Sequence, residues 1–423
     1  MSKPQIALLH YTAAPIIGGV ENVVSQHARL FHEAGYPVTL VTGRGSSDET
    51  FARSVVIPEL DSGNPENLQI ARALETGHVP ADFYTLQSRV EHLLAPHFGQ
   101  ADIVVAHNVF NFHFNLPLTA ALHGLIDRGA IKKLIVWCHD TSRFVNPSSG
   151  TKLRFGFPWD LLRTFRPEVT YVTVSQQRQR TLAQVLGCPP EDIRVVPNGV
   201  DPMTLLGLSS LGQHLVEEFR LLEADLIALM PIRITRAKNI EFALKVTAAL
   251  KASDLHPRLL VTGPPDPHAA DISAYCDGLL AERRELGVED EVIFAYSGTS
   301  QTKSPLMMNP SAVAELYRVC DLVLMPSHRE GFGMPVIEGG LVGKPIFATA
   351  IPALEEVGRD SVYVIEPGES PAQVAARIRL WAQQDITHRL RRRVRQEYTW
   401  PSVFSRMIEP LIVGAGKPAK ESL

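Results

Sequence analysis

Short apolar runs alternate with longer amphipathic stretches along most of this chain. In the first half, the runs typical of β-strands cover residues 6–10, 37–42, 103–106, 134–138 and 171–174. Between the first two runs, a helical pattern begins at Glu21 and ends before Gly35. Because strands alternate with helices, the pattern predicts a mostly parallel sheet with helices on both faces. We therefore expect the first half to be a doubly wound α/β domain.

The alternation restarts in the second half. Residues 193–202 form a strand-like segment that ends in turn residues, including Pro197 and Pro202. Beyond it, strand-like runs cover residues 226–234, 258–262, 292–295, 321–325 and 345–348, and a helix is expected at residues 237–251. A chain of 423 residues exceeds what one hydrophobic core usually serves. We predict two Rossmann-like domains, residues 1–202 and residues 203–398, that face a cleft.

Composition narrows the class of protein. Hydrophobic residues make up 45% and charged residues 20%, which is typical of a globular protein. The formal net charge of −4 leaves no global field for nucleic acid, so no nucleic-acid partner is expected. The four cysteines are widely spaced, which suits a reducing cytoplasm, and no apolar run is long enough to span a bilayer. We expect a cytoplasmic protein, with peripheral contact to the inner face of the membrane as an open alternative.

The segment at residues 321–349 carries the most specific chemistry. A strand at residues 321–325 is followed by a connection, and Pro335 suits the first turn of a helix. Gly331 and Gly333 leave the backbone bare beside the N-terminus of that helix. Free N–H groups and the helix dipole attract a phosphate there.

Two carboxylates flank this expected phosphate site. Glu330 precedes the helix and Glu338 lies one turn inside it. Ionised carboxylates accept strongly from sugar or ribose hydroxyls, so the pair can hold groups on either side of a diphosphate. Either glutamate alone would be explained as a residue that favours a helix N-terminus. Together with the two glycines and Pro335 they favour a nucleotide-sugar site at residues 328–338.

A basic cluster lies about one hundred residues upstream. Arg233 is expected at the end of the strand at residues 226–234, and Lys238 in the first turn of the next helix. Both side chains can then overhang the carboxyl edge of the sheet, where ligands of α/β proteins bind. Arg236 could replace either of them. Alone, the cluster would be interpreted as solvated loop charges.

These motifs together resemble family four of the retaining GT-B glycosyltransferases. The resemblance covers nearly the whole chain and rests on Gly18-Gly19-Val20-Glu21, Pro197-Asn198-Gly199-Val200-Asp201, Arg233 with Lys238, and the segment from Glu330 to Glu338. It implies that a C-terminal helix at residues 399–416 packs back on the first domain.

The resemblance also implies roles for the donor site. Arg233 and Lys238 would hold the diphosphate of a nucleoside-diphosphate sugar, Glu330 would bond sugar hydroxyls, and Glu338 would bond the ribose. The remaining donor contacts would come from backbone groups of Gly331, Phe332, Gly333, Met334, Gly18 and Gly19. In this chain residues 351–355 lack the glycines that relatives often carry, which leaves the role of that loop open.

Polar residues at the carboxyl edge of the first sheet are candidates for the sugar and the acceptor. His139 follows the strand at residues 134–138, and the resemblance places it against the sugar. Asp140 could orient its imidazole or contact the acceptor. Asn108 and His107 follow the strand at residues 103–106 and could face the acceptor, or could equally be turn residues. Residues 141–159 are a further candidate acceptor region, and residues 297–310 form either an inert loop or one that faces the cleft.

The expected reaction moves a sugar to an acceptor hydroxyl with retention. No Asp-x-Asp sequence is present, so charge on the leaving diphosphate would be neutralised by Arg233, Lys238 and a helix N-terminus, and neither metal nor other cofactor is expected. The resemblance implies front-face substitution, in which the departing phosphate takes the acceptor's proton. The acceptor is left open among a sugar, a glycan, a lipid-linked sugar and a small molecule.

Alternatives remain at this point. A nucleotide-sugar 2-epimerase or hydrolase shares the architecture, as do synthases that use a free sugar as acceptor and a non-catalytic nucleotide-sugar-binding protein. The basic run at residues 388–395 could contact a membrane. Because Leu390 and Val394 are four residues apart, the favoured interpretation is that they pack while the arginines point to water.

Overall fold

The computed structural model describes residues 3–46, 50–141, 154–269, 271–297, 308–414. These residues form two compact units, one made of residues 1–199 with 400–423 and the other of residues 200–399. The sequence-based boundaries lie close by, after residues 202 and 398. Each unit contains one sheet, and all strand pairs recorded in the described residues are parallel.

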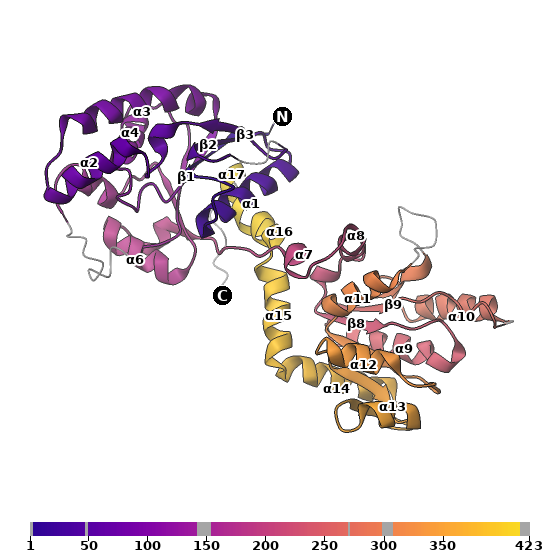
Figure 1. The fold of residues 1–423 in the computed structure, drawn as a ribbon. Coiled ribbons are helices and arrows are strands. Elements are labelled where there is room, and N and C mark those ends of the chain that lie inside the picture. The colour runs from indigo at the N-terminus through magenta and orange to yellow at the C-terminus, as the bar shows by residue number, and fades with distance from the viewer. Residues whose placement is uncertain (1–2, 47–49, 142–153, 270, 298–307, 415–423) are drawn as a thin grey trace. The chain divides into compact units, whose positions relative to one another are not determined.

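The N-terminal unit has a seven-stranded sheet in the order β3-β2-β1-β4-β5-β6-β7 (Figure 1). Its strands are β1 (Ile6–Thr12), β2 (Val38–Arg44), β3 (Arg53–Val56), β4 (Ile103–His107), β5 (Leu134–Cys138), β6 (Thr170–Thr173) and β7 (Ile193–Val195). Its helices are α1 (Gly19–Glu33), α2 (Pro65–Thr76), α3 (Ala81–Gln100), α4 (Leu116–Asp127), α6 (Gln176–Leu186), α16 (Trp400–Val403) and α17 (Glu409–Val413).

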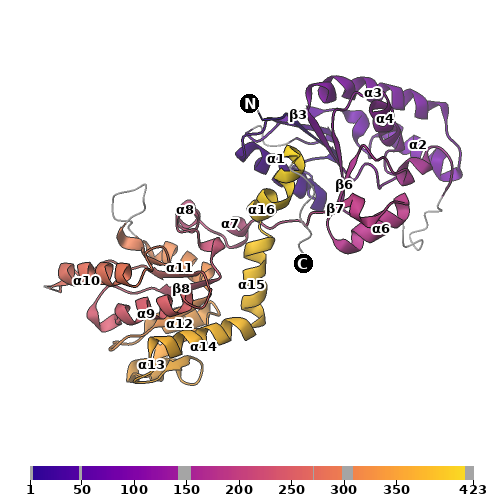
Figure 2. The same ribbon diagram turned by 180° about the vertical axis from the view of Figure 1, so that it is seen from behind.

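Alternate residues of these strands point to opposite faces, so the sheet has two cores. On one face, residues such as Leu9 and Val104 pack with α2, α3, α4 and α6. On the other face, residues such as Leu8 and Val105 pack with α1 and the C-terminal helices. The segment at residues 400–413 lies beside α1 in both views (Figure 1, Figure 2), where Phe404 contacts Phe31 edge to face. This face therefore needs the C-terminal segment for its cover.

The C-terminal unit has a six-stranded sheet in the order β10-β9-β8-β11-β12-β13. Its strands are β8 (Leu226–Met230), β9 (Pro257–Val261), β10 (Val292–Phe294), β11 (Leu322–Met325), β12 (Ile346–Thr349) and β13 (Tyr363–Ile365). Its helices are α7 (Pro202–Leu205), α8 (Ser210–Glu218), α9 (Ile240–Lys251), α10 (Ile272–Glu285), α11 (Pro310–Val319), α12 (Met334–Leu341), α13 (Pro352–Gly358), α14 (Pro371–Gln384) and α15 (Ile386–Glu397).

The second sheet is also covered on both faces. Helices α9, α10 and α14 pack on one face, with Leu259 and Leu324 among the buried strand residues. Helices α8, α11, α12 and α13 pack on the other, with Leu260 and Val323. The predicted fold class, two doubly wound Rossmann-like domains, is confirmed. No helix among the described residues combines the length and the apolar character that a membrane span requires.

The prediction missed one strand at an edge of each sheet. β3 contains Arg53 and Ser54, and its burial pattern shows no fully buried position. β13 has three residues, of which only Ile365 is buried. Short edge strands with partly exposed side chains lack the apolar run that marks a central parallel strand.

Candidate functional site

Two loops meet at the carboxyl edge of the second sheet, after the neighbouring strands β8 and β11. The backbone N–H of His328 donates to the carbonyl of Ala237 over 2.8 Å, and the Asn239 side chain donates to the carbonyl of Pro326 over 3.0 Å. Asn239 has φ +52°, a left-handed conformation that asparagine tolerates better than most residues. These bonds hold the loop after β8 against the loop after β11.

The contact between these loops places Lys238 beside Glu330. The Nζ atom of Lys238 donates to Glu330 Oε2 over 2.6 Å, and Ser327 Oγ donates to Glu330 Oε1 over 2.7 Å. The Glu330 side chain is only 6% exposed and that of Lys238 19%. Both oxygens of a nearly buried carboxylate are therefore satisfied, as a buried charge requires. Ser327 was not predicted, although its place three residues before Glu330 at the end of a strand is a usable signal.

The local structure around Lys238 differs from the prediction. β8 ends at Met230, because Pro231 has no N–H for the sheet, and Ile234 forms only an isolated bridge with Pro265. Residues Arg236–Lys238 form a 3-10 turn, and α9 begins at Ile240. Lys238 thus precedes the helix and does not lie in its first turn.

Arg236, predicted as a possible replacement for Arg233 or Lys238, has partners of its own. Its guanidinium pairs with Asp271 at 2.8 Å and lies over the ring of Tyr275, 4.6 Å from the centroid. These contacts direct it toward α10. Of Arg236 and Lys238, only Lys238 contacts Glu330.

Arg233 is exposed and has no hydrogen-bond or ion-pair partner within the described part of the chain. The backbone around it is tightly packed against Gly263, whose N–H donates to the carbonyl of Ile232 over 3.0 Å. A Cβ at position 263 would lie 2.8 Å from the Cα of Arg233 and 2.2 Å from the Ile232 carbonyl oxygen. A side chain at this position would displace Arg233. Gly263, which follows β9, is therefore a site residue that the sequence interpretation missed.

The start of α12 has the conformation that a phosphate site needs. Gly333 caps the helix with φ +93°, and a Cβ there would approach Leu354 Cδ2 to 2.6 Å. Because Leu354 lies on α13, this contact gives the start of α13 a structural role at the site. Gly331 has open space where a side chain would stand, and Phe332 and Met334 are each 52% exposed. The helix N-terminus is thus open to a ligand, and its dipole favours an anion.

Glu338 lies one turn into α12, as predicted, and is held by a residue that the prediction missed. The hydroxyl of Tyr317, on α11, donates to Glu338 Oε2 over 2.7 Å. Burial raises the pKa of Tyr317 above its ordinary value, and the neighbouring carboxylate raises it further. Tyr317 therefore stays a neutral donor and fixes one oxygen of Glu338, while Glu338 itself is exposed.

In the N-terminal unit, the Asn108 side chain holds the backbone of His139. Asn108 is buried with φ +59°, and its Oδ1 accepts from the backbone N–H of His139 over 2.9 Å. The Asn111 side chain donates to the same oxygen and to the carbonyl of Asp140. These bonds satisfy the Asn108 Oδ1 inside the protein and give Asn108 the structural role of a turn residue, while contact with the acceptor stays a prediction.

His139 contacts a second imidazole, that of His107. His107 Nδ1 lies 2.9 Å from His139 Nε2, and the ring centroids are 5.2 Å apart with an angle of 17° between the ring planes, so the two rings lie edge to edge in nearly one plane. Burial, followed by the nearby His27 and His10, lowers the pKa of His139 to about 3. Burial likewise lowers the pKa of His107 well below its ordinary value. Both rings are neutral at physiological pH, so one of the two facing nitrogens donates to the other and the tautomers of His107 and His139 are linked.

Gly18 and Gly19 form the start of α1. Gly18 has φ −160° and caps the helix without a side chain, so the N–H groups of the first turn remain open. A Cβ on Gly18 would lie 2.0 Å from Glu21 Oε2. Thr12 donates to the other Glu21 oxygen over 2.6 Å. Gly18 thus leaves room for Glu21 to fold back on the helix start, while a Cβ on Gly19 would meet open space.

Asp140 pairs with Arg178 of α6 at 3.1 Å. The imidazole of His139 contacts His107.

Two predicted regions fall largely outside the described residues: residues 142–153 of the candidate acceptor region and residues 298–307 of the loop before α11.

The interpretation of the basic run at residues 388–395 was wrong for part of the run: Arg389 and Arg393 are exposed, as expected, but Arg395 is not. Arg395 is buried, and its two terminal guanidinium nitrogens donate to the two carboxylate oxygens of Asp321, over 2.7 and 2.8 Å. Burial alone would raise the pKa of Asp321, but Arg395 and its neighbours hold it well below the ordinary value. Leu390, expected to pack, is 61% exposed. Arg395 faces the protein interior because two buried aspartates, Asp225 and Asp321, lie at the amino ends of β8 and β11.

Two family models match adjoining parts of the chain. Glycosyltransferase Family 4 matches residues 17–203, and Glycosyl transferases group 1 matches residues 215–398. The two matches correspond to the two sheets, and the second contains the loops that carry Arg233, Lys238 and Glu330.

Named relatives agree with the family models. A D-inositol 3-phosphate glycosyltransferase of Acidothermus cellulolyticus is 29% identical over 214 residues, 49% of this chain and 44% of that protein. The enzyme of the same name from Stackebrandtia nassauensis is 31% identical over 43% of this chain and 39% of that protein. The chain thus spans less than half the length of these two relatives. D-inositol 3-phosphate glycosyltransferase 1 of Catenulispora acidiphila is 26% identical over 380 residues, 86% of this chain and 82% of that protein. The chain belongs to the group 1 glycosyltransferases of the GT-B type.

Proposed function

We propose that the protein transfers a sugar from a nucleoside-diphosphate sugar to an acceptor hydroxyl with retention of the anomeric configuration. The observation that carries this proposal is the set of charged groups at one edge of the C-terminal sheet. Arg233 is exposed without a partner among the described residues, Lys238 is held by Glu330, and α12 opens its N-terminus at the same edge of the sheet. A diphosphate supplies the anion that such a set lacks.

Each donor group has a proposed place in this set. The diphosphate binds Arg233, Lys238 and the backbone N–H groups at Gly333 and Met334. The ribose bonds the Glu338 oxygen that Tyr317 leaves free, and the sugar hydroxyls bond Glu330. Roles of Gly18, Gly19 and His139 in donor binding stay predictions of the family resemblance.

The proposed reaction is a front-face substitution. The bond between the anomeric carbon and the β-phosphate oxygen breaks, and the acceptor oxygen bonds to the same face of that carbon. The acceptor's proton passes to the departing phosphate oxygen. Arg233, Lys238 and the α12 N-terminus stabilise the negative charge that develops on the diphosphate, so we propose that no metal is required. Both Glu330 oxygens already accept hydrogen bonds, which supports a binding role over attack on the sugar.

The test is turnover with and without acceptor. Panels of UDP-, GDP- and ADP-sugars are incubated with the protein and candidate acceptors, and D-inositol 3-phosphate is included because it stands in the names of the relatives. We expect donor consumption that depends on an acceptor, and an NMR coupling at the anomeric proton that matches that of the donor. Rapid conversion of the donor alone would favour an epimerase or hydrolase. Donor binding without any product would favour a non-catalytic binding protein. A covalent sugar on any carboxylate would overturn the front-face step.

A further inference from the structure

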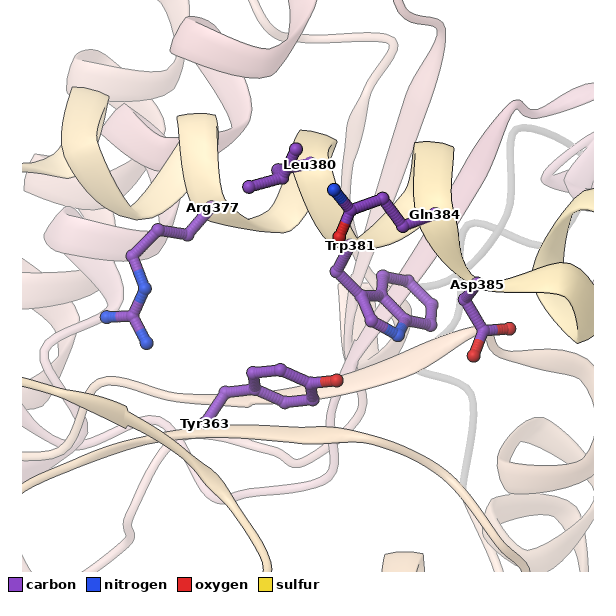
Figure 3. Close-up of a pocket in the computed structure, with 6 residues that line it drawn as sticks. All are labelled: Tyr363, Arg377, Leu380, Trp381, Gln384 and Asp385. Atoms are coloured by element: carbon purple, nitrogen blue, oxygen red, sulfur yellow. The ribbon is translucent and has the colours of Figure 1, made fainter.

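Two hollows flank α14 in the C-terminal unit. One, of about 360 Å³, is lined by Tyr363, Trp381 and Arg377 among others (Figure 3). The other, of about 550 Å³, lies between α14, α15 and the amino end of β8. Because Asp225 lines the second hollow and precedes β8, this hollow lies at the opposite end of the sheet from the Arg233 loop.

The two hollows differ in how their arginines are neutralised. In the smaller one, Arg377 pairs with Glu369 at 2.8 Å. In the larger one, Arg392 pairs with Asp225 at 2.7 Å. The larger hollow also contains one further acidic residue, Glu397, and three further arginines, Arg379, Arg389 and Arg393. These three are exposed, and no hydrogen bond or ion pair of their side chains is recorded within the described part of the chain.

Three unpaired guanidinium groups around one hollow repel each other. Arg389 and Arg393 are four residues apart on α15, a spacing at which like charges destabilise a helix. Arg379 faces the same hollow from α14. The whole chain has a formal net charge of −4, so this concentration of positive charge is local. An anion in the hollow would remove the repulsion, and planar guanidinium groups match the geometry of phosphate.

Two exposed aliphatic side chains border the same hollow. Ile386 is 77% exposed and Leu390 is 61% exposed, four residues apart on α15. A small soluble phosphate would leave both of them in water. A phospholipid bilayer offers a phosphate for the arginines and an apolar layer just beneath it for Ile386 and Leu390.

We propose that the hollow between α14 and α15 binds the phosphate headgroup of an anionic phospholipid at a membrane surface. Arg379, Arg389 and Arg393 contact the phosphate, while Ile386 and Leu390 enter the interface. The site is independent of the donor site, which lies at the other end of the sheet. It attaches the protein to the membrane and implies nothing about the acceptor.

The experiment is vesicle co-sedimentation of the full chain. One set of vesicles contains phosphatidylcholine alone, and the other contains equal parts of phosphatidylcholine and phosphatidylglycerol. We expect binding to the anionic vesicles only. The triple variant Arg379→Gln/Arg389→Gln/Arg393→Gln should lower the partition coefficient on the order of a hundredfold, since each arginine near an anionic surface contributes roughly fivefold. Ile386→Ser/Leu390→Ser should weaken binding with every charge kept.

A matched triple variant controls for net charge. Arg53, Arg72 and Arg180 are exposed arginines of the N-terminal unit, and changing all three to glutamine also takes the net charge from −4 to −7, since −4 − 3 = −7. This control should bind anionic vesicles like the wild type. Equal loss in both triple variants, equal binding to neutral vesicles, or no binding at all would overturn the proposal. So would stabilisation of the wild type by inorganic phosphate or RNA without vesicle binding. Thermal unfolding of each variant verifies that it is folded.

Discussion

Lys238 Nζ donates to Glu330 Oε2 over 2.6 Å and thereby joins the loops that follow β8 and β11. Glu330 is 92 residues away in sequence, so the pair exists only because β8 and β11 are neighbours in the sheet. Without donor, each residue neutralises the other. In the proposed mechanism, Lys238 contacts the diphosphate of the bound donor while Glu330 keeps Ser327 as a partner. We therefore propose that the ion pair holds the site ready before the donor binds.

Breaking this pair should abolish most of the activity. In Lys238→Met, the nearly buried Glu330 keeps only Ser327, and one positive charge at the leaving group is lost. We expect kcat/KM to fall about a hundredfold or more, and similarly for Glu330→Gln. The double variant should be little worse than either single variant, because the two residues act as a unit. Losses that multiply in the double variant would show that they act separately.

The ribose contact predicts a different kinetic pattern. Glu338→Gln removes an interaction that the ground state and the transition state share, so KM for the donor should rise roughly tenfold while kcat changes little. Tyr317→Phe frees one Glu338 oxygen and should raise KM by a smaller factor. Tyr36→Phe is the control, because it also removes a tyrosine–glutamate bond, to Glu409, on the N-terminal unit. A lower kcat with unchanged KM in Glu338→Gln would contradict a ribose role.

His27 predicts how stability depends on pH. Its two ring nitrogens are buried with no hydrogen-bond partner among the described residues, and burial lowers its pKa to about 3. The unfolded chain binds this proton below about pH 6.5 and the folded protein does not, so stability falls as the pH drops from 6.5 toward 3. Over this range, each pH unit lowers the free energy of unfolding by about 1.4 kcal/mol for such a histidine.

Replacing His27 should therefore stabilise the protein at acid pH. We expect the change in unfolding free energy caused by His27→Leu to be about 2 kcal/mol more favourable at about pH 5 than at about pH 7.5. Urea unfolding at both pH values measures the difference. His78→Leu, at an exposed position, serves as the control. An equal effect of His27→Leu at both pH values would show that His27 is not held neutral in the fold.

Two arginines of α15, Arg395 and Arg393, should differ sharply in how much their replacement lowers the free energy of unfolding. Arg395→Met leaves Asp321 buried without its bidentate partner and should cost about 3–5 kcal/mol. Arg393→Met, two residues earlier on an exposed position, should stay within about 0.5 kcal/mol of the wild type. Thermal and urea unfolding of both variants test this. Equal effects would mean that the Arg395–Asp321 pair contributes no net stability.

The sequence predicted those features that depend on local pattern. Strand order along the chain, the start of α12 at its glycine and proline, and the position of Glu338 follow from short-range periodicity and turn residues. The basic run on α15 was misinterpreted because Asp321 lies 74 residues from Arg395 in the sequence. Tyr317 and Gly263 were missed for the same reason: their partners come together only through the packing of neighbouring strands and helices.

The central claim is that Arg233 and the α12 N-terminus bind a nucleoside diphosphate, and isothermal titration tests it most directly. Wild type and Arg233→Gln are titrated with UDP, GDP, ADP and the corresponding nucleosides, and Arg236→Gln is the matched control because Arg236 pairs with Asp271. We predict that one diphosphate binds the wild type and the control alike, and binds Arg233→Gln at least about tenfold more weakly, with no matching loss for the nucleoside. Equal affinity of all three proteins, or no binding of any diphosphate, would contradict the account.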